Sequence, residues 1–368
     1  MRVIKIVTVV GARPQFVKAA ALSRAIDNFN SKSNDVKINE SIVHTGQHYD
    51  DNMSKIFFEQ LKIPHPEINL EVGSGLHGKQ TALMLEKLEE VVIDKKPDWI
   101  LVYGDTNSTL AAAIVASKLH IPVAHVEAGL RSFNRKMPEE VNRVVADHLS
   151  KLLLCPTDTA VNNLSNEGIT DGVHQVGDVM YDSVLFNFKL AAGSSTIIEE
   201  LELESKQYYL STIHRAENTD DPQRLKNIVD AFSQIEKTIV LPLHPRTRKT
   251  LGDSLEKLAS NVLITEPVSY LDMLMLEKNA SLILTDSGGV QKEAYWAGVP
   301  CITLRDETEW VELVDAGVNQ IVGADAVAIL NAVKKTEQVA GKFKSNNAQL
   351  YGDGSTADKI LEIICGVV

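Results

Sequence analysis

The sequence is poor in cysteine, which limits the kind of protein it can encode. Cys155, Cys301 and Cys365 are the three cysteines among 368 residues, and their spacing matches no metal-binding motif. An odd and widely spaced set argues against a disulfide framework. It predicts buried thiols in a reducing compartment, so we expect a cytoplasmic protein.

Long apolar stretches are also missing. No uninterrupted apolar run approaches the ~18–20 residues that a membrane-spanning helix needs. The chain opens on a β-branched run, Ile4–Val10, without the basic and apolar regions of a secretion signal. We therefore expect neither membrane insertion nor secretion.

Positive charge is scarce relative to negative charge. Lys and Arg number 37 against 49 Asp and Glu, which gives a formal net charge of −12. This balance argues against nucleic acid as the main partner. His-x-x-His and His-Glu-x-x-His pairs are absent, so we expect no bound metal. The loop after the first predicted strand lacks the glycine patterns of nicotinamide-binding and Walker-type sites, so we expect no cofactor.

What the sequence does contain is an alternation of strands and helices that occurs twice. The first series ends near residue 178, and the second begins at Tyr208. Two series in 368 residues predict two Rossmann-like domains, each a doubly wound parallel sheet, that face each other across a cleft. We place these α/β domains at residues 1–178 and 179–353.

A short stretch of the second half, Thr285–Glu293, has the layout of an anion site between a predicted strand and a predicted helix. Asp286 and Ser287 suit the N-cap of that helix. Gly288 and Gly289 carry no Cβ, so a ligand can approach the backbone closely. The free N–H groups and the positive helix end favour a phosphate. The alternative is a capped turn that binds nothing.

Polar side chains follow the carboxyl ends of other predicted strands. Asp105 and Glu127 each follow a strand of the first half, and Arg13 follows the first strand. In doubly wound sheets these ends line the ligand crevice, where an Arg can bind phosphate oxygens with two hydrogen bonds. Taken singly, Asp105 could be a helix cap, and the other two could be surface charges. His214 and His244 stand at strand ends of the second half, where structural and catalytic histidines are equally common.

A set of motifs, in order along nearly the whole chain, resembles the non-hydrolysing UDP-N-acetylglucosamine 2-epimerases. The motifs are Gly11-Ala12-Arg13-Pro14, Gln47-His48, Gly104-Asp105-Thr106, His125-Val126-Glu127-Ala128-Gly129-Leu130-Arg131, Pro138-Glu139-Glu140-x-Asn142-Arg143, His214-Arg215-x-Glu217-Asn218 and Asp286-Ser287-Gly288-Gly289-x-Gln291-x-Glu293. Each motif alone is weak, but together they are specific. The resemblance implies a fold like that of GT-B glycosyltransferases, with a C-terminal helix in residues 354–368 that returns to the first domain. It also implies a homodimer that needs neither a nicotinamide nor a metal.

The resemblance further implies which residues serve the nucleotide-sugar site. The proton carriers would be Asp105, Glu127 and Glu139, with His214 as a further catalytic residue; the substrate-binding residues would be Arg13, Lys18, Arg143, Ser287, Gly288, Gly289, Glu293 and Trp310. Within this set, the turn at Ser287 would hold the diphosphate, and Glu293 the ribose hydroxyls. A second, activating UDP-sugar site would use Gln47, Gln80, Arg215 and His244.

Two departures from the family pattern concern the substrate. Many members read T-E-R-P-E where this chain has Thr308-Glu309-Trp310-Val311-Glu312, and many read G-T-R-P-E where it has Gly11-Ala12-Arg13-Pro14-Gln15. Both departures resemble the branch that acts on UDP-2,3-diacetamido-2,3-dideoxy-glucuronic acid. The substrate is therefore expected to be UDP-GlcNAc or this close derivative.

The reaction that the resemblance implies is elimination followed by re-addition, in a pathway that supplies surface polysaccharides. UDP leaves C1 while a base removes the C2 proton, and UDP then adds back as C2 is protonated from the other face. This chemistry needs acid–base groups on both faces of the ring and stabilisation of the departing diphosphate. The alternatives are a GT-B glycosyltransferase, a hydrolysing 2-epimerase and a catalytically silent nucleotide-sugar-binding protein.

Overall fold

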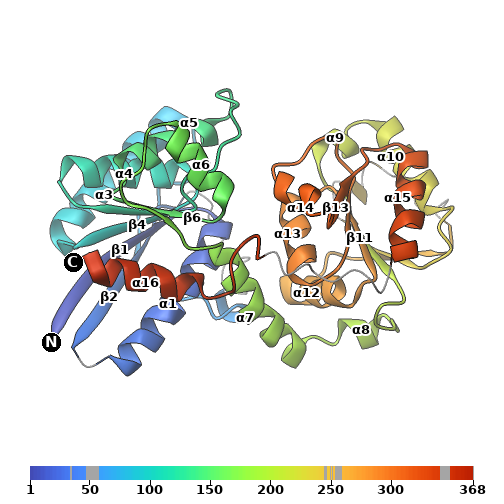
Figure 1. The fold of residues 1–368 in the computed structure, drawn as a ribbon, viewed down its shortest axis with the longest axis horizontal. Coiled ribbons are helices and arrows are strands. Elements are labelled where there is room, and N and C mark those ends of the chain that lie inside the picture. Colours follow the sequence, from blue (N-terminus) through green and yellow to red (C-terminus); the bar gives the residue numbers. More distant parts are fainter. Residues whose placement is uncertain are drawn as a thin grey trace. The chain divides into compact units, whose positions relative to one another are not determined.

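The computed structural model of the chain describes residues 1–33, 35–46, 58–243, 247, 248, 250, 252, 259–339 and 349–367. Contacts between residues divide it into two compact units (Figure 1). Unit 1 comprises Met1–Leu185 together with Tyr351–Val368, and unit 2 comprises Phe186–Leu350. Each unit is built around its own parallel sheet.

The sheet of unit 1 has seven strands among the described residues, in the order β3-β2-β1-β4-β5-β6-β7, and every neighbouring pair is parallel. The strands are β1 (Arg2–Val10), β2 (Val36–His44), β3 (Ile68–Asn69), β4 (Trp99–Tyr103), β5 (Val123–Val126), β6 (Leu152–Cys155) and β7 (Val173–Gln175). All five residues of β4 are buried, as expected for a central strand that is covered on both faces.

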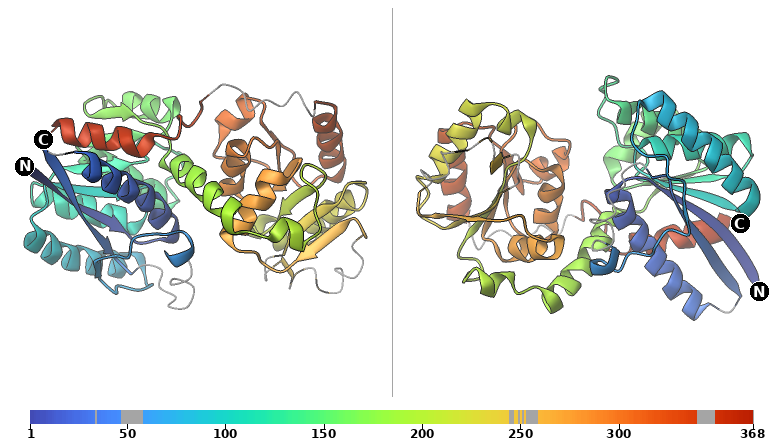
Figure 2. Two further views of the ribbon diagram at one scale, coloured as in Figure 1. Left: turned by 90° about the horizontal axis from the view of Figure 1, so that it is seen from below. Right: turned by 180° about the vertical axis from the view of Figure 1, so that it is seen from behind.

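Helices cover both faces of this sheet because its strands are apolar on both sides. On one face, α3 (His77–Lys95) and α4 (Asn107–Lys118) pack with Val7 and Val9 of β1 in a common core. On the other face, α1 (Arg13–Lys32) contacts β1, β2 and β4, and α16 (Thr356–Val367) lies beside α1. Figures 1 and 2 both show α16, the last helix of the chain, next to α1. Helix α5 (Pro138–Leu149) packs against α4, and α6 (Asp158–Asn166) contacts β6 and β7.

The sheet of unit 2 has six parallel strands among the described residues, in the order β10-β9-β8-β11-β12-β13. The strands are β8 (Tyr209–Thr212), β9 (Ile239–Pro242), β10 (Val262–Thr265), β11 (Leu282–Thr285), β12 (Cys301–Thr303) and β13 (Asn319–Ile321). The helices are α8 (Ile197–Glu200), α9 (Ala216–Thr219), α10 (Pro222–Phe232), α12 (Tyr270–Asn279), α13 (Gly288–Trp296), α14 (Val311–Asp315) and α15 (Ala326–Val339), while α7 (Val179–Ser194) begins in unit 1 and ends in unit 2.

Strand β11 shows how this sheet is covered. Leu282 and Leu284 pack into a core with α10 and α15, while Ile283 between them packs into a second core with α12 and α13. Successive strand side chains point to opposite faces, so the alternating burial means helices on both sides. The prediction of two doubly wound parallel sheets is confirmed.

Within the described part of the chain, no helix is both long enough and apolar enough to cross a bilayer.

Candidate active site

The two strand-end carboxylates of unit 1 follow neighbouring strands. Strands β4 and β5 are paired in parallel, with Tyr103 opposite Val126. Glu127 directly follows β5 and Asp105 lies two residues beyond β4, so both lie at the carboxyl edge of the sheet, where α/β proteins bind ligands.

Glu127 is paired with a cation from helix α1. Lys18 of α1 donates to its carboxylate, and the two side chains are only 13% and 8% exposed. Burial would lower the pKa of Lys18, but the charge of Glu127 and the hydrogen bond to it raise the pKa above its usual value. Lys18 is therefore an ammonium ion paired with a carboxylate.

The backbone around this pair adopts left-handed conformations. Glu127 has a φ of +69°, which is costly for a residue with a side chain. Gly104, which precedes Asp105, has a φ of +60°, and a Cβ there would lie 3.2 Å from the Glu127 carboxylate and 3.8 Å from the Lys18 ammonium. A glycine at this turn lets the carboxylate and the ammonium approach the backbone, and strain of this kind concentrates at functional sites.

Asp105 is held in place by two residues of helix α5. Arg143 forms an ion pair with its carboxylate, and the neighbouring Asn142 amide donates to its backbone carbonyl at 2.9 Å. The Asp105 side chain keeps 31% of its surface exposed, against 15% for Arg143. Asp105 is thus fixed by its backbone and its charge, yet its side chain stays accessible.

The start of α5 carries two carboxylates with different roles. Glu139, the residue predicted for the site, is exposed. Glu140 is 3% exposed and accepts hydrogen bonds of 2.9 Å from the backbone of Ser132 and Phe133 and from the Ser132 hydroxyl. Burial alone would raise the pKa of Glu140, but these hydrogen bonds lower it below its usual value. Glu140, which sequence reasoning did not assign, organises the loop before α5.

Arg13 stands at the first position of α1 and is exposed. Its loop is fixed by Gln15, a buried amide that sequence reasoning noted only as a departure from the family pattern. The Gln15 Oε1 accepts from the backbone of Gly11 at 2.8 Å and of Ala12 at 3.0 Å, and its Nε2 donates to the Tyr103 carbonyl at 2.6 Å. Gln15 therefore ties the loop that carries Arg13 to the end of β4.

The residues predicted for an activator site are only partly described. Gln47 and His244 lie outside the described residues, and Arg215 is exposed in unit 2. Gln80 is buried in unit 1, where its Oε1 accepts from Asn107 at 2.8 Å and its Nε2 donates to the Gly73 carbonyl at 2.8 Å.

In unit 2, the turn before α13 corrects one expectation about the helix cap. Ser287 is the N-cap, and its hydroxyl accepts from the Val290 N–H at 3.5 Å. Asp286 does not cap the helix. Its carboxylate reaches across to the loop after β8, because β8 and β11 are adjacent strands whose ends meet.

Asp286 is fully buried and collects several donors from that loop. It accepts from the backbone N–H groups of His214 and Arg215 and from the Asn218 amide, at 3.0–3.1 Å. The His214 Nδ1 lies 3.6 Å from the same carboxylate, and the ring is 40% exposed. Asp286 therefore fixes His214 beside the start of α13 while leaving part of its ring accessible.

The two glycines of the turn have different surroundings. A Cβ on Gly288 would come within 2.2 Å of the Glu309 carboxylate, whereas a Cβ on Gly289 would meet nothing closer than 3.9 Å. Trp310 packs against the first glycine and donates from Nε1 to the Gly288 carbonyl at 2.9 Å. The Lys292 ammonium lies 4.1 Å from the centre of the Trp310 ring, in a cation–π contact.

Glu293 belongs to a buried pair of carboxyl groups. It is 9% exposed and accepts from the Tyr270 hydroxyl at 2.9 Å, while Glu277 beside it is fully buried. Burial raises the pKa of Glu293, and burial together with the charge of Glu293 raises that of Glu277 well above its usual value. Two charges cannot share so dry a site, so the pair does not carry two negative charges.

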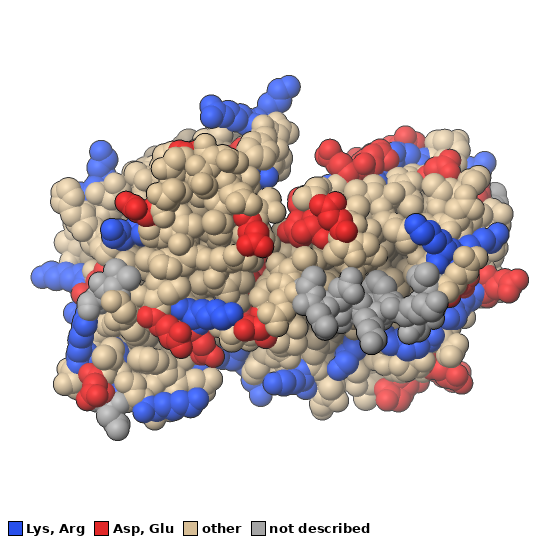
Figure 3. Space-filling view, in the orientation of Figure 1, with Lys and Arg blue, Asp and Glu red and all other residues tan. Residues whose placement is uncertain are grey.

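The placement of the charged side chains bears on two kinds of site, a metal centre among the described residues and a nucleic-acid surface on one face. No group of three His, Cys, Asp or Glu side chains in that part of the chain could hold a metal ion. On the face drawn in Figure 3, Lys and Arg side chains are interspersed with Asp and Glu over each unit, and the coloured residues form no continuous basic stripe.

Comparison with known proteins gives concordant matches over nearly the whole chain. A family model described as UDP-N-acetylglucosamine 2-epimerase matches residues 31–365. A UDP-N-acetylglucosamine 2-epimerase homolog of Methanococcus maripaludis is 51% identical over 98% of this chain and 99% of its own length. The UDP-2,3-diacetamido-2,3-dideoxy-D-glucuronate 2-epimerase of Pseudomonas aeruginosa is 49% identical over 98% and 99%. The crystal structure of Methanocaldococcus jannaschii UDP-GlcNAc 2-epimerase in complex with UDP-GlcNAc and UDP has a TM-score of 0.79 and 45% identity, covering 99% of this chain and 100% of that one.

Proposed function

The chain belongs to the UDP-N-acetylglucosamine 2-epimerase family, and from this premise we propose that it inverts C2 of a UDP-linked N-acetylhexosamine by eliminating and re-adding UDP. The membership confirms the resemblance drawn from the motifs, and the protein is an epimerase. The substrate and the roles of individual residues are the proposed part.

The chemistry explains why paired carboxylates are needed. The C2 proton of the sugar is not next to a carbonyl carbon, so removing it gives no stabilised enolate. A base instead removes that proton while the C1–O bond breaks and its electron pair leaves with UDP, which forms a 2-acetamidoglucal. UDP then attacks C1, and C2 takes a proton from the opposite face. Proton carriers on both faces are therefore required.

We assign the proton transfers to Asp105, Glu127 and Glu139. The observation that carries this assignment is the placement of the first two at adjoining strand ends, each held by a cation, Arg143 or Lys18. A fixed and ionised carboxylate is suited to accept a proton.

We assign the nucleotide to unit 2. The diphosphate would bind the N–H groups of Gly288 and Gly289 and the Ser287 hydroxyl at the start of α13, with His214 of the same unit as a further donor. The Glu293 carboxylate would accept from the ribose hydroxyls. The relative from Methanocaldococcus jannaschii is described in complex with UDP-GlcNAc and UDP, which supports a UDP-sugar as the ligand of this chain.

Replacing Gly289 by Ala is expected to separate UDP binding from folding. The new methyl group meets nothing within 3.9 Å, and Ala favours helix more than Gly, so the Tm should not fall. The methyl would occupy the space through which the diphosphate approaches, and we expect the Kd for UDP, measured by calorimetry, to rise at least ~10-fold, about 1.4 kcal/mol. Unchanged UDP affinity in Gly289→Ala would place the diphosphate elsewhere.

Trp310 is expected to bear on the choice of sugar. Replacing it by Arg restores the residue that many family members carry, and it introduces a second cation beside Lys292. We expect Trp310→Arg to shift the ratio of kcat/KM towards UDP-GlcNAc, relative to UDP-2,3-diacetamido-glucuronate, by at least ~10-fold, as one pocket contact typically does. The control is Trp310→Phe, which keeps the ring and adds no charge. An unchanged ratio in Trp310→Arg would remove Trp310 from the specificity site.

Incubation with one UDP-sugar and no acceptor tests the proposed function. An epimerase converts UDP-GlcNAc to UDP-ManNAc, or the diacetamido-glucuronate to its C2 epimer. A hydrolysing epimerase instead releases UDP and free sugar, and a glycosyltransferase gives neither product without an acceptor. Release of free sugar, or no reaction with either UDP-sugar, would contradict the proposal.

Four further assignments follow from the family and stay predictions. They are a homodimer, the cytoplasm as compartment, a role in polysaccharide synthesis, and an activating site at Gln80 and Arg215 that also includes Gln47 and His244.

A further inference from the structure

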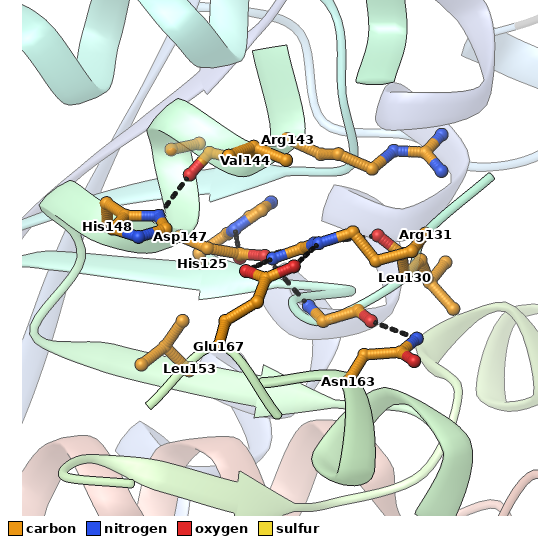
Figure 4. A network of polar contacts seen from close by, with 12 residues as sticks. His125, Leu130, Arg131, Arg143, Val144, Asp147, His148, Leu153, Asn163 and Glu167 are labelled. Carbon is orange, nitrogen blue, oxygen red and sulfur yellow. Dashed lines mark hydrogen bonds and ion pairs between the residues drawn. The ribbon is translucent and has the colours of Figure 1, made fainter. Parts of the chain in front are cut away.

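His125 is a buried histidine whose two ring nitrogens both face hydrogen-bond acceptors. Figure 4 shows its contact with Asp147. It lies at the end of β5, two residues before Glu127, and is fully buried. Its Nδ1 lies 2.7 Å from the Asp147 carboxylate and its Nε2 lies 2.7 Å from the Gly104 carbonyl oxygen. No step of the proposed reaction uses this side chain.

Asp147 is ionised in this network. Its second oxygen accepts from the Gly129 N–H at 3.1 Å and from Arg131 at 2.7 Å, and Arg131 also binds Glu167 with two hydrogen bonds of 2.7 Å. Burial alone would raise the pKa of Asp147, but His125 and Arg131 lower it below its usual value. A carboxylate in this state can only accept, so the His125 Nδ1 donates to it.

The same logic applies to the other nitrogen of His125. A carbonyl oxygen has no proton to give, so the Gly104 carbonyl can only accept, and Nε2 must donate to it. A neutral imidazole carries one N–H, and two donated bonds require the imidazolium ion.

The bond to Gly104 acts on the proposed catalytic groups. Gly104 is the left-handed residue whose turn leads into Asp105 and against which the Glu127 carboxylate packs. We propose that His125 is a positioning residue, held as an imidazolium by Asp147, that fixes the Asp105 turn relative to Glu127. This inference rests on the proposed function, since it assumes that these two carboxylates act on the substrate.

The charged groups that face His125 favour its cationic form. Asp147 faces it from α5 and Glu127 from its own strand end, while Arg131 and Lys18 each pair with one of these carboxylates. Burial alone would lower the pKa of His125, but Asp147, the Gly104 carbonyl and Glu127 raise it above its usual value. The stabilisation from this cation is therefore complete below the usual histidine pKa of about 6.5 and is lost as the pH rises through the higher pKa of the folded protein.

Nitrogen NMR of the protein labelled with ¹⁵N-histidine tests the charge state without any activity measurement. The chain has ten histidines, and the signal of His125 is assigned as the one that disappears in His125→Gln. At pH 7.5, an ordinary histidine with a pKa of about 6.5 is roughly nine-tenths neutral. We expect His125 to show two protonated nitrogens at this pH. A neutral tautomer would overturn the inference.

A pair of variants tests the positioning role. In His125→Asn the amide can replace Nδ1, which leaves the Gly104 carbonyl without its donor; in His125→Gln it can replace Nε2, which keeps that bond. We expect kcat per folded molecule to fall ~10²-fold in His125→Asn, as small misplacements of reacting groups do, and clearly less in His125→Gln, with KM little changed in both. The control is His148→Gln, an exposed residue of α5, which should behave as wild type.

The outcomes separate this inference from the proposed function. A wild type that does not epimerise defeats the proposed function, while the NMR result still stands on its own. An active wild type, with His125 variants that lose stability but keep kcat per folded molecule, would make His125 a structural residue only. If His125→Asn does not fold, the NMR result and the His125→Gln variant still decide the question. A neutral His125 would contradict positioning through Gly104. A His125→Gln protein that loses as much kcat as Asp105→Asn would contradict it too.

Discussion

Replacing Asp105 by Asn is expected to lower turnover of the UDP-sugar by at least ~10²–10⁴-fold, the usual contribution of a general acid–base group. Asn has the shape of Asp and can still accept from Arg143, but it cannot exchange a proton with C2. The Asp105 side chain is 31% exposed and its backbone is held by Asn142, so the fold should tolerate the change. The measurements are kcat with each UDP-sugar and the rate of deuterium entry at C2 in D₂O.

Two controls make this result specific to the proton transfer. UDP affinity should change little in Asp105→Asn, because the proposed diphosphate site at the start of α13 is untouched. Asp171→Asn, which alters an exposed residue of the loop before β7, should have wild-type kcat. Near-wild-type C2 exchange in Asp105→Asn would move the proton transfer to Glu127 or Glu139. Loss of UDP binding or unfolding would make Asp105 a structural residue only.

Replacing Asp286 by Ala is expected to disrupt both the fold of unit 2 and its UDP site. The substitution leaves the N–H groups of His214 and Arg215 without an acceptor and takes one of two acceptors from the Asn218 amide, which keeps the Leu304 carbonyl. A buried donor left unpaired costs ~1–3 kcal/mol, so we expect the free energy of unfolding to fall by about 3 kcal/mol or more. His214 also loses the group that holds it beside α13, so UDP should bind at least ~10-fold more weakly, a loss of about 1.4 kcal/mol.

Scanning calorimetry and UDP titration of the folded variant measure the two effects separately. The matched control is Asp306→Ala in the same unit, since its 62% exposed carboxylate pairs with Arg224 at the surface. Exposed ion pairs contribute ~0–1 kcal/mol, so this variant should keep both Tm and UDP affinity. An Asp286→Ala protein as stable as wild type would show that water replaces the lost acceptor and that Asp286 does not fix His214.

The sequence predicts the central strands of both sheets because they are continuous apolar runs. Strands β4 and β6 are such runs, and every residue in them is buried. The short strands β7 and β13, of three residues each, were not predicted. β7 contains no buried residue and β13 one, so neither forms an apolar run, and only pairing with a neighbouring strand defines them.

The site could be predicted as a set of strand-end residues, but its internal pairing could not. Lys18 and Glu127 are 109 positions apart in the sequence. The donors that bind Asp286 lie 68 to 72 positions before it. Only the folded sheet brings such residues together. Gln15 and Glu140 are polar residues near predicted loops, where a sequence pattern indicates exposure. Both are buried in the structure because neighbouring loops cover them, and the sequence pattern does not show that packing.

Exchange of the C2 proton tests the central claim most directly. Wild-type protein is incubated in D₂O with UDP-GlcNAc or with UDP-2,3-diacetamido-glucuronate, and the nucleotide sugars are examined by NMR. We predict that the substrate and its C2 epimer will both accumulate deuterium at C2, because elimination and re-addition pass the proton through the solvent-exchangeable carboxyl groups. Formation of the epimer with the original proton retained, or release of free sugar and UDP without an epimer, would contradict the account.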